Sequence, residues 1–161
     1  MQEVEKVLGH EEVVKHLKNA AAMGKVSHSY IFAGEKGSGK KLLAKLFAMT
    51  LQCETHGEQP CLQCSSCKKA MNRNHPDIIY IRHEKPNSIG IEDIREQLIS
   101  DVSIKPYTGP YKIYIVDEAE KMTVQAQNAL LKTIEEPPAY AVILLLVNNG
   151  STLLRLLHPD A

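Results

Sequence analysis

The sequence predicts a three-layer α/β fold built on a parallel β-sheet, and three observations lead to this prediction. Segments with strand character alternate with segments of helical periodicity along the chain, which is the pattern of a parallel sheet with helices on its faces. A glycine-rich segment, residues 34–41, joins a short β-rich segment to an apolar-faced helix. An unbroken apolar run over residues 141–147 suits a strand buried on both faces.

The first half of the chain is predicted to contain one helix and then a strand–loop–helix unit. Residues 11–23 place Val13, Leu17 and Ala20 on one helical face, and Gly24 suits the position after the last turn. Residues 29–33 are rich in β-formers and lead directly into the glycines. Apolar residues recur at helical spacing from Leu42 to Leu51. Residues 53–67 carry four cysteines and show no periodicity.

The second half of the chain continues the alternation of strands and helices. Strands are predicted over residues 77–82, 112–117 and 141–147, and helices over 91–102 and 123–135. The second of these helices ends at Glu136-Pro137-Pro138, because proline cannot continue a helix.

Composition limits the classes of function. At 161 residues the chain is expected to form one domain over 1–161. Its 19 basic and 19 acidic residues balance, so we expect weak or no autonomous binding to DNA, which needs a basic face. No apolar run approaches membrane length, and the N-terminus lacks a signal-peptide core. We therefore expect no membrane partner and a cytoplasmic protein.

Residues 34–41 form a nucleotide-phosphate loop that is complete except at its last position. The segment is Gly34-Glu35-Lys36-Gly37-Ser38-Gly39-Lys40-Lys41, whereas the usual pattern G-x-x-x-x-G-K-[ST] ends in a hydroxyl that holds Mg²⁺. Backbone N–H groups of the loop and the helix N-terminus would face a phosphate, and Lys40 would reach the terminal phosphates. The alternative is a glycine-rich turn between strand and helix. Because Lys41 replaces the hydroxyl, competent Mg²⁺ geometry is not expected, and whether ATP binds without it is left open.

Two further positions complete the candidate nucleotide site. Asp117 and Glu118 follow the strand predicted over 112–117, where an ATPase places an acid that holds Mg²⁺ and a glutamate that polarises water. The alternative is an acidic cap at a strand exit. Lys41 is expected near the position of the cation, or turned to solvent. Asn148 and Asn149 follow the last strand, where a sensor of the γ-phosphate would lie, although a simple turn explains them equally well.

The four cysteines are spaced Cys53-x7-Cys61-x2-Cys64-x2-Cys67. In a reducing compartment this arrangement indicates a metal site before disulfides, and a set of four sulfurs suits structural Zn²⁺. An iron–sulfur cluster and unligated thiols are the alternatives. Ferredoxins place a further cysteine and a proline just downstream, whereas Lys68-Lys69-Ala70 follows here.

The motifs together resemble the bacterial clamp-loader subunits of DNA polymerase III. The resemblance runs from about residue 7 to 154 and rests on the following segments: Ser27–Phe32 with the phosphate loop, the four cysteines, Asn74–Asp77, Asp117–Met122, and Asn128–Pro138 as the most specific. The chain looks more like the delta-prime subunits than like the gamma/tau motor, because the motor keeps the hydroxyl that Lys41 replaces.

The resemblance implies an AAA+ fold with a zinc module inserted at about 53–67. It also implies membership of a ring-shaped pentamer with gamma/tau and delta subunits, which opens the sliding clamp and places it on primed DNA. In that family delta-prime acts as a stator without polymerase chemistry, so weak or absent ATPase activity is expected. An active gamma/tau-like ATPase motor and a stand-alone zinc-bearing nucleotide-binding module are the alternatives.

The C-terminal segment departs from the family pattern. The family continues with a Ser-Arg-Cys segment, a fifth strand, a lid and a collar, and Arg155 has neither serine nor cysteine beside it. One extra base before the codon for Arg155 would shift the frame to a Ser-Arg-Cys ending. Our hypothesis is a single-base deletion that removes the final strand, lid and collar, and sequencing of the encoding DNA would test it.

Overall fold

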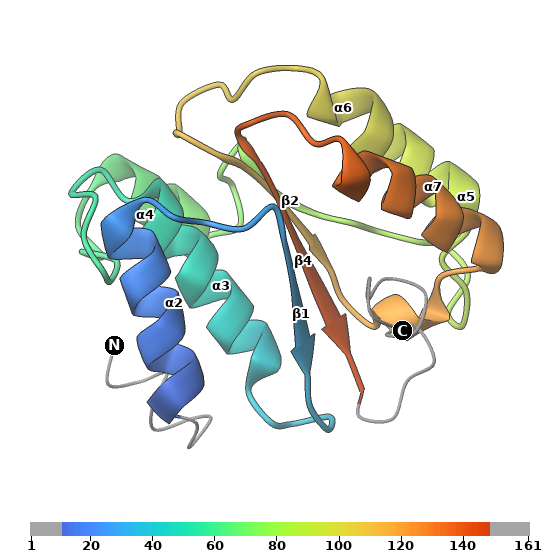
Figure 1. Ribbon diagram of the computed structural model, residues 1–161, viewed down its shortest axis with the longest axis horizontal. Helices are drawn as coiled ribbons and strands as arrows, with labels where there is room; N and C mark the ends of the chain where they lie inside the picture. The colour runs from blue at the N-terminus through green and yellow to red at the C-terminus, as the bar shows by residue number, and fades with distance from the viewer. Residues whose placement is uncertain (1–10, 149–161) are drawn as a thin grey trace.

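A parallel sheet forms the centre of the protein in the computed structural model, which describes residues 11–148 (Figure 1). Its strands are β1 (Ser29–Ala33), β2 (Ile78–Tyr80), β3 (Lys112–Val116) and β4 (Ala141–Val147). They lie in the order β1-β4-β3-β2, and all three pairings are parallel. The predicted fold class is confirmed.

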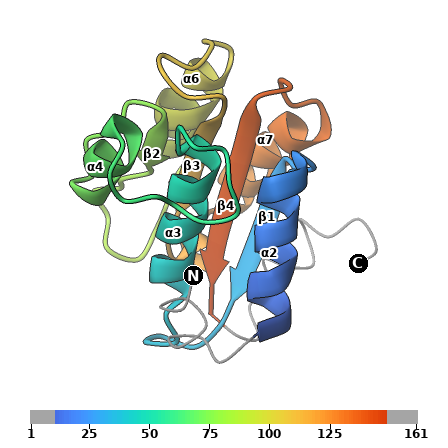
Figure 2. The same cartoon turned by 90° about the vertical axis from the view of Figure 1, so that its left-hand side faces the viewer.

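Helices cover both faces of the sheet. The structure contains α2 (Glu11–Met23), α3 (Lys40–Gln52), α4 (Ser65–Met71), α5 (Ile91–Ile94), a π-helical turn (Arg95–Ile99), α6 (Ser100–Val102), a 3₁₀ turn (Ala119–Lys121) and α7 (Val124–Glu135). Helices α2, α3 and α4 lie on one side of the sheet and α5, α6 and α7 on the other (Figures 1 and 2). Among the described residues, no helix is both long enough and apolar enough to span a membrane.

The apolar side chains of the central strands explain the three layers. Successive residues of a strand point to opposite faces of a sheet. In β3, Ile113 and Ile115 therefore join the core beneath α3, whereas Tyr114 and Val116 join the core beneath α7. Every residue of β4 is buried, which is why the sequence shows an unbroken apolar run rather than an alternating one.

The predicted strand over 77–82 is shorter in the structure. The Asp77 carboxylate accepts hydrogen bonds from the backbone N–H groups of Tyr107, Thr108 and Gly109, at 2.7–2.9 Å, so it caps a neighbouring loop. At the other end, the backbone of Arg82 bonds to the side chain of Gln97 instead of to β3. The Asp77 side chain and the Arg82 backbone therefore have partners outside the sheet, whereas the Asp77 carbonyl still accepts a hydrogen bond from Ile113 N of β3 at 2.9 Å.

The helix predicted over 91–102 is present, but its middle is a π-helical turn, residues 95–99. Ile94, Leu98 and Val102 are all buried against the sheet. A spacing of four residues drifts around a helix with 3.6 residues per turn, and a wider turn keeps these three side chains on one face. Periodicity alone does not distinguish the two helix types.

Helix α4 was not predicted, because the sequence was expected to lack regular structure over 53–67. Only Cys67 and Ala70 are buried in this seven-residue helix, which is too little to produce a visible apolar period. The cysteine module therefore spans residues 53–71 in the structure and ends with α4. Asn149 and the segment 150–161, including Arg155, lie outside the described residues.

Candidate functional site

The candidate nucleotide site lies at the carboxyl ends of three adjacent strands. The phosphate loop connects β1 to α3, Asp117 follows β3 and Asn148 follows β4. Because the strands are parallel, their carboxyl ends meet at one edge of the sheet. The fold thus brings together three segments that are far apart in the sequence.

The glycines of the loop are placed where side chains would be strained or would collide. Gly37 and Gly39 have φ angles of +87° and +91°, in the left-handed region that favours glycine. A Cβ atom at Gly34 would lie 2.7 Å from Ser38 Oγ. The backbone therefore folds tightly around the start of α3, as a phosphate cradle requires.

Lys40 and Asn148 contact each other beside this loop. Lys40 is 8% exposed, and its Nζ donates to Gly34 O at 2.8 Å and to Asn148 Oδ1 at 3.2 Å. The Asn148 Nδ2 group in turn donates to Glu120 Oε2 at 2.9 Å. The loop lysine is thus held by uncharged oxygens, and a phosphate would offer it a countercharge.

Ser38 shows that the loop fits a phosphate. Its Oγ atom is buried and has no hydrogen-bond partner within the described residues. A buried hydroxyl without a partner costs roughly 1–3 kcal/mol, and a phosphate oxygen would supply that partner. Together with Gly34, Gly37, Gly39 and Lys40, this hydroxyl makes the loop a candidate phosphate site.

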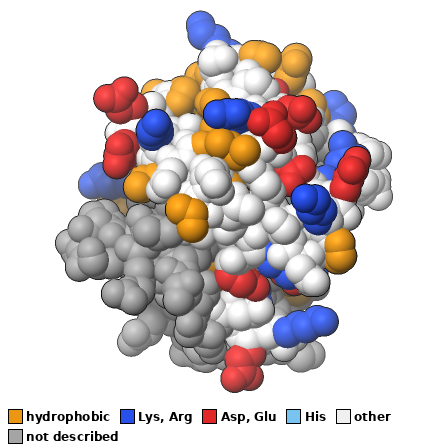
Figure 3. Space-filling model, turned by 90° about the vertical axis from the view of Figure 1, so that its right-hand side faces the viewer, with side chains coloured by type: hydrophobic (Ala, Val, Ile, Leu, Met, Phe, Trp, Pro, Cys, Tyr) orange, Lys and Arg blue, Asp and Glu red, His pale blue; other side chains and the backbone are white. Residues whose placement is uncertain are grey.

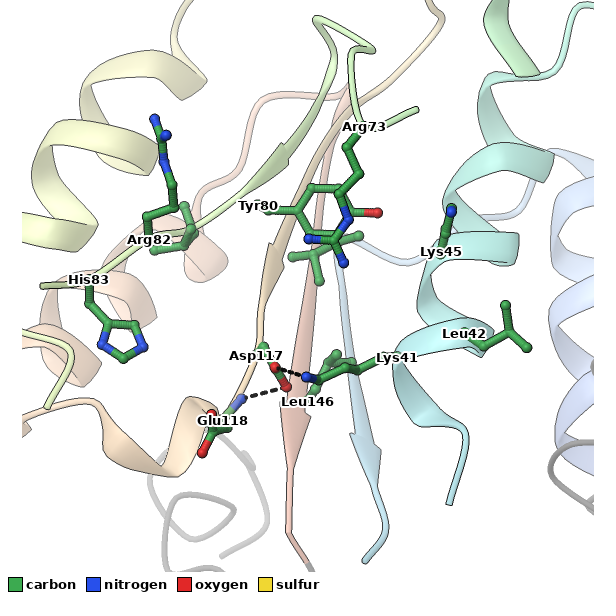
Figure 4. Close-up of a pocket in the computed structure, with 12 residues that line it drawn as sticks. Lys41, Leu42, Lys45, Arg73, Tyr80, Arg82, His83, Asp117, Glu118 and Leu146 are labelled. Atoms are coloured by element: carbon green, nitrogen blue, oxygen red, sulfur yellow. Dashed lines mark hydrogen bonds and ion pairs between the residues drawn. The ribbon is translucent and has the colours of Figure 1, made fainter. Parts of the chain in front are cut away.

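Lys41 occupies the place where a magnesium ligand would be needed. Its Nζ lies 2.9 Å from Asp117 Oδ2, with the two side chains 68% and 34% exposed. The other carboxylate oxygen, Asp117 Oδ1, accepts a hydrogen bond from Glu118 N at 2.9 Å (Figure 4). Of the two positions expected for Lys41, the structure shows the one beside the acid. In this arrangement the carboxylate that would hold Mg²⁺ is paired with an ammonium group, and the ion could bind there only if Lys41 moved away.

Glu118 also forms an ion pair, with Lys121. Its Oε2 atom lies 2.6 Å from Lys121 Nζ, and its side chain is directed away from Lys41 (Figure 4). The hydrogen bond from Lys121 lowers the pKa of Glu118, which makes the carboxylate a weaker base. Its backbone has a φ of +50°, so the carboxylate is turned out of the strand direction.

The four cysteines form a compact cluster, as their spacing predicted. Their sulfur atoms all lie within 4.8 Å of one another, and two of the separations, Cys53–Cys64 and Cys61–Cys67, are 4.0 Å. In a tetrahedral site with zinc–sulfur bonds of about 2.3 Å, the sulfurs are about 3.8 Å apart. The donor set therefore fits a single metal ion bound by sulfur alone.

Backbone amides support this cluster. Cys61 N donates to Cys53 Sγ, Cys64 N to Cys61 Sγ, and Cys67 N to Cys64 Sγ, at 3.2–3.4 Å. Burial raises the pKa of Cys67 to about 12. Burial also raises the pKa of Cys53, but hydrogen bonds from Thr55 and Cys61 bring it down to about 6. A bound cation would favour the thiolate form of all four residues.

A buried hydrogen-bond chain that the sequence analysis missed ties the cysteine module to the sheet. Ser66 Oγ in α4 donates to Gln52 O at 2.7 Å and lies 3.0 Å from His75 Nε2. His75 Nδ1 accepts from Asp77 N at 3.0 Å, so Nε2 carries the proton of the neutral ring. Burial lowers the pKa of His75, which favours the neutral form of the ring. The segment Asn74–Asp77 was the only sequence signal for this contact.

Comparisons with known proteins place the chain among DNA polymerase III subunits. The family described as "DNA polymerase III, delta subunit" matches residues 9–157. DNA polymerase III subunit tau of Bacillus subtilis (strain 168) is 40% identical over 147 residues, covering 89% of this chain and 25% of the relative. The corresponding tau subunit of Escherichia coli (strain K12) is 35% identical over 148 residues, covering 91% and 23%.

A solved structure agrees with this placement. The gamma subunit-related protein of DNA polymerase III from Thermotoga maritima MSB8 superposes with a TM-score of 0.60 at 26% identity, covering 89% of this chain and 42% of that protein. The chain spans about a quarter of the length of the two tau subunits. It is homologous to the tau and gamma subunits, and it belongs to the family of DNA polymerase III delta subunits.

Proposed function

We propose that this chain acts as a non-hydrolysing, delta-prime-like subunit of the DNA polymerase III clamp loader, which helps to load the sliding clamp onto primed DNA. Its proposed partners are the gamma/tau and delta subunits, and through them the clamp and DNA, in the cytoplasm. The observation that carries the proposal is the ion pair between Lys41 and Asp117 at 2.9 Å.

Because of this ion pair, we expect that the site could bind a nucleotide without hydrolysing it. Hydrolysis by a phosphate-loop ATPase requires Mg²⁺ to bridge the phosphates and a residue to position the attacking water. An ammonium group offers positive charge but coordinates neither phosphate nor water as a metal does. Lys41 takes the place of the ligand hydroxyl, and Glu118 is paired with Lys121. The loop that fits a phosphate thus lacks the parts that drive the reaction.

The balance of surface charge favours a role inside an assembly. Figure 3 shows acidic and basic side chains interspersed over the face of α5 and α7, with no broad area of one sign. Sequence-independent DNA binding depends on neutralising several phosphates with a basic face. We therefore assign contact with DNA to the assembled loader.

The cysteine cluster is proposed as a structural zinc site. Four protein ligands would close a tetrahedral coordination shell and leave no open position for catalysis. This donor set resembles a structural zinc site in two respects. The sulfur atoms have the spacing of a tetrahedral site, and three backbone N–H groups donate hydrogen bonds to sulfur. The ion would hold residues 53–71, which have little apolar core of their own.

A reconstituted complex tests the hydrolytic part of the proposal. The loader is assembled with the full-length protein, its reading frame after Leu154 restored if the deletion is found, and with gamma/tau subunits whose own phosphate-loop lysines have been replaced. We expect stable co-purification and no ATP hydrolysis above the level of a complex assembled without the chain. Clamp- and DNA-stimulated hydrolysis in that complex would show that the chain is itself a motor.

The second candidate function is that of an active gamma/tau-like ATPase motor. Asp117 and Glu118 are both present, and the relatives include tau subunits with 35–40% identity. The same reconstitution distinguishes the two functions. Failure to co-purify with any loader subunit would instead support a stand-alone nucleotide-binding module.

A further inference from the structure

Glu120, an acid outside the residues predicted for the nucleotide site, contacts Asn148 through both of its carboxylate oxygens. Its Oε2 atom accepts a hydrogen bond from Asn148 Nδ2 at 2.9 Å, and its Oε1 atom accepts one from Asn148 N at 3.3 Å. Within residues 11–148, Glu120 forms no ion pair. Asn148 therefore provides hydrogen-bond donors to a carboxylate that has no cation beside it in the part of the chain that the structure describes.

The backbone around Glu120 is fixed by its neighbours. Glu120 lies in the 3₁₀ turn Ala119–Lys121, which follows β3. Ala119 and Met122 are buried, and Met122 N donates to Ala119 O at 3.1 Å. Because β4 lies beside β3 in the sheet, this turn lies against the carboxyl end of β4. Packing of the turn thus places the Glu120 carboxylate next to Asn148.

Opposite charges at the two ends of the Asn148 amide fix its orientation. Oδ1 accepts from the Lys40 ammonium at 3.2 Å, and Nδ2 donates to the Glu120 carboxylate at 2.9 Å. An amide oxygen accepts hydrogen bonds and an amide nitrogen donates them. Turning the amide around would place its oxygen against a carboxylate and its nitrogen against an ammonium group, and both hydrogen bonds would be lost.

A residue that senses the γ-phosphate needs the opposite orientation. Phosphate oxygens accept hydrogen bonds, so such a residue must direct a donor at them. In this structure the acceptor Oδ1 faces Lys40, the lysine that would hold the terminal phosphates. A γ-phosphate bound to Lys40 would therefore lie beside an oxygen that cannot donate to it.

We propose that Glu120 is a positioning residue that turns the amide donor of Asn148 away from the γ-phosphate, so that the site distinguishes ATP poorly from ADP. This inference rests on the proposed function, in which the site holds a nucleotide without hydrolysing it. A subunit with such a site keeps the same bound state whether ATP or ADP occupies it. That property suits a part of the loader that does not turn over nucleotide.

Calorimetric titrations of ATP and of ADP into the zinc-loaded chain, without Mg²⁺, test this proposal. The measured quantity is the Kd for ADP divided by the Kd for ATP. Glu120→Ala frees the amide to direct its nitrogen at the γ-phosphate, so this ratio should rise about tenfold, as the gain of a charge-assisted hydrogen bond does. Glu120→Gln should keep the ratio closer to the native value, because the glutamine oxygen still accepts from Asn148 Nδ2. In an Asn148→Ala background, Glu120→Ala should leave the ratio unchanged.

Two further measurements separate this role from a structural one. Glu135→Ala is the matched control, because it removes an exposed acid at the last residue of α7, and it should show the native ratio. The NMR signals of the Asn148 side-chain amide, recorded without nucleotide, should move in Glu120→Ala and stay in place in Glu135→Ala. Melting temperatures verify the folding of each variant.

Several outcomes would overturn the proposal. Equal rises of the ratio in Glu120→Ala and Glu120→Gln would mean that charge alone sets it. A rise that persists in the Asn148→Ala background, or Asn148 amide signals that ignore Glu120→Ala, would mean that the effect does not pass through this amide. Failure of both nucleotides to bind would also overturn it, whereas the proposed stator role would still stand or fall with the reconstituted complex.

Discussion

Replacing Lys41 with serine should make the affinity of the nucleotide site for ATP depend on Mg²⁺. In the native chain the Lys41 ammonium lies 2.9 Å from Asp117, beside the position that Mg²⁺ would take. Serine removes this charge and restores the hydroxyl that the phosphate-loop pattern uses to hold the ion. We therefore expect the affinity for ATP to respond to Mg²⁺ more strongly in the Lys41→Ser variant than in the native chain.

The contacts of Lys41 set the size of the effect. If the ammonium stayed in place, a monovalent and a divalent cation about 4 Å apart would repel each other by about 2 kcal/mol even at the dielectric constant of water, or about 30-fold in affinity. If the 68%-exposed side chain moved to solvent, the loss of an exposed ion pair would cost only about 0.2–1 kcal/mol. The Mg²⁺ enhancement of ATP binding should therefore be larger in Lys41→Ser than in the native chain, by about 1.5- to 5-fold if the lysine moves aside and by about 30-fold if it stays in place.

The assay is a calorimetric titration of ATP with and without Mg²⁺. Lys45→Ser is the matched control, because it removes the same charge one turn along α3, where Nζ contacts Met71 O rather than Asp117. This control should show the Mg²⁺ response of the native chain. An unchanged response in Lys41→Ser would refute the view that the lysine excludes the ion.

Three other changes test the site and the fold. Cys64→Ser should lower the zinc content below one ion per chain and lower the melting temperature, both measured in the presence of a weak chelator, because one of four ligands is lost. Burial raises the pKa of Asp77, but backbone N–H donors from Thr108, Gly109 and Tyr107 hold it below the ordinary value. The stabilisation is therefore present above about pH 4 and lost as pH falls through the lower folded-state pKa. Asp77→Asn should cost about 1.5–3 kcal/mol at pH 7, and urea titrations should show this difference shrinking in acid. Leu130→Ala, at a fully buried position of α7, should cost about 2–5 kcal/mol in the same assay.

Local patterns were enough to predict most of the elements. The helix over 11–23 and the strands over 29–33 and 141–147 have the predicted bounds. Their apolar periods or runs are long enough to be visible and end at glycine, proline or polar residues. The phosphate loop and the four cysteines were equally visible, because their chemistry depends on spacing within a short segment.

Other features were decided by contacts between distant segments. The pairing of Lys41 with Asp117, and of Lys40 with Asn148, depends on the strand order β1-β4-β3-β2. The sequence had left Lys41 either beside the acid or in solvent. Helix α4 and Arg73, whose φ of +57° lies in the left-handed region, had no local signal, because packing against Gln52, His75 and Tyr80 determines their positions.

By itself, then, the sequence determined the α/β class, the incomplete phosphate loop and the candidate metal ligands, since short-range spacing encodes each of them. The tertiary structure decided that Lys41 pairs with Asp117 and that Lys40 contacts Asn148. The physical reason is that ion pairs and hydrogen bonds act over a few ångströms in space, whereas the residues that form them here are up to 108 positions apart in the chain.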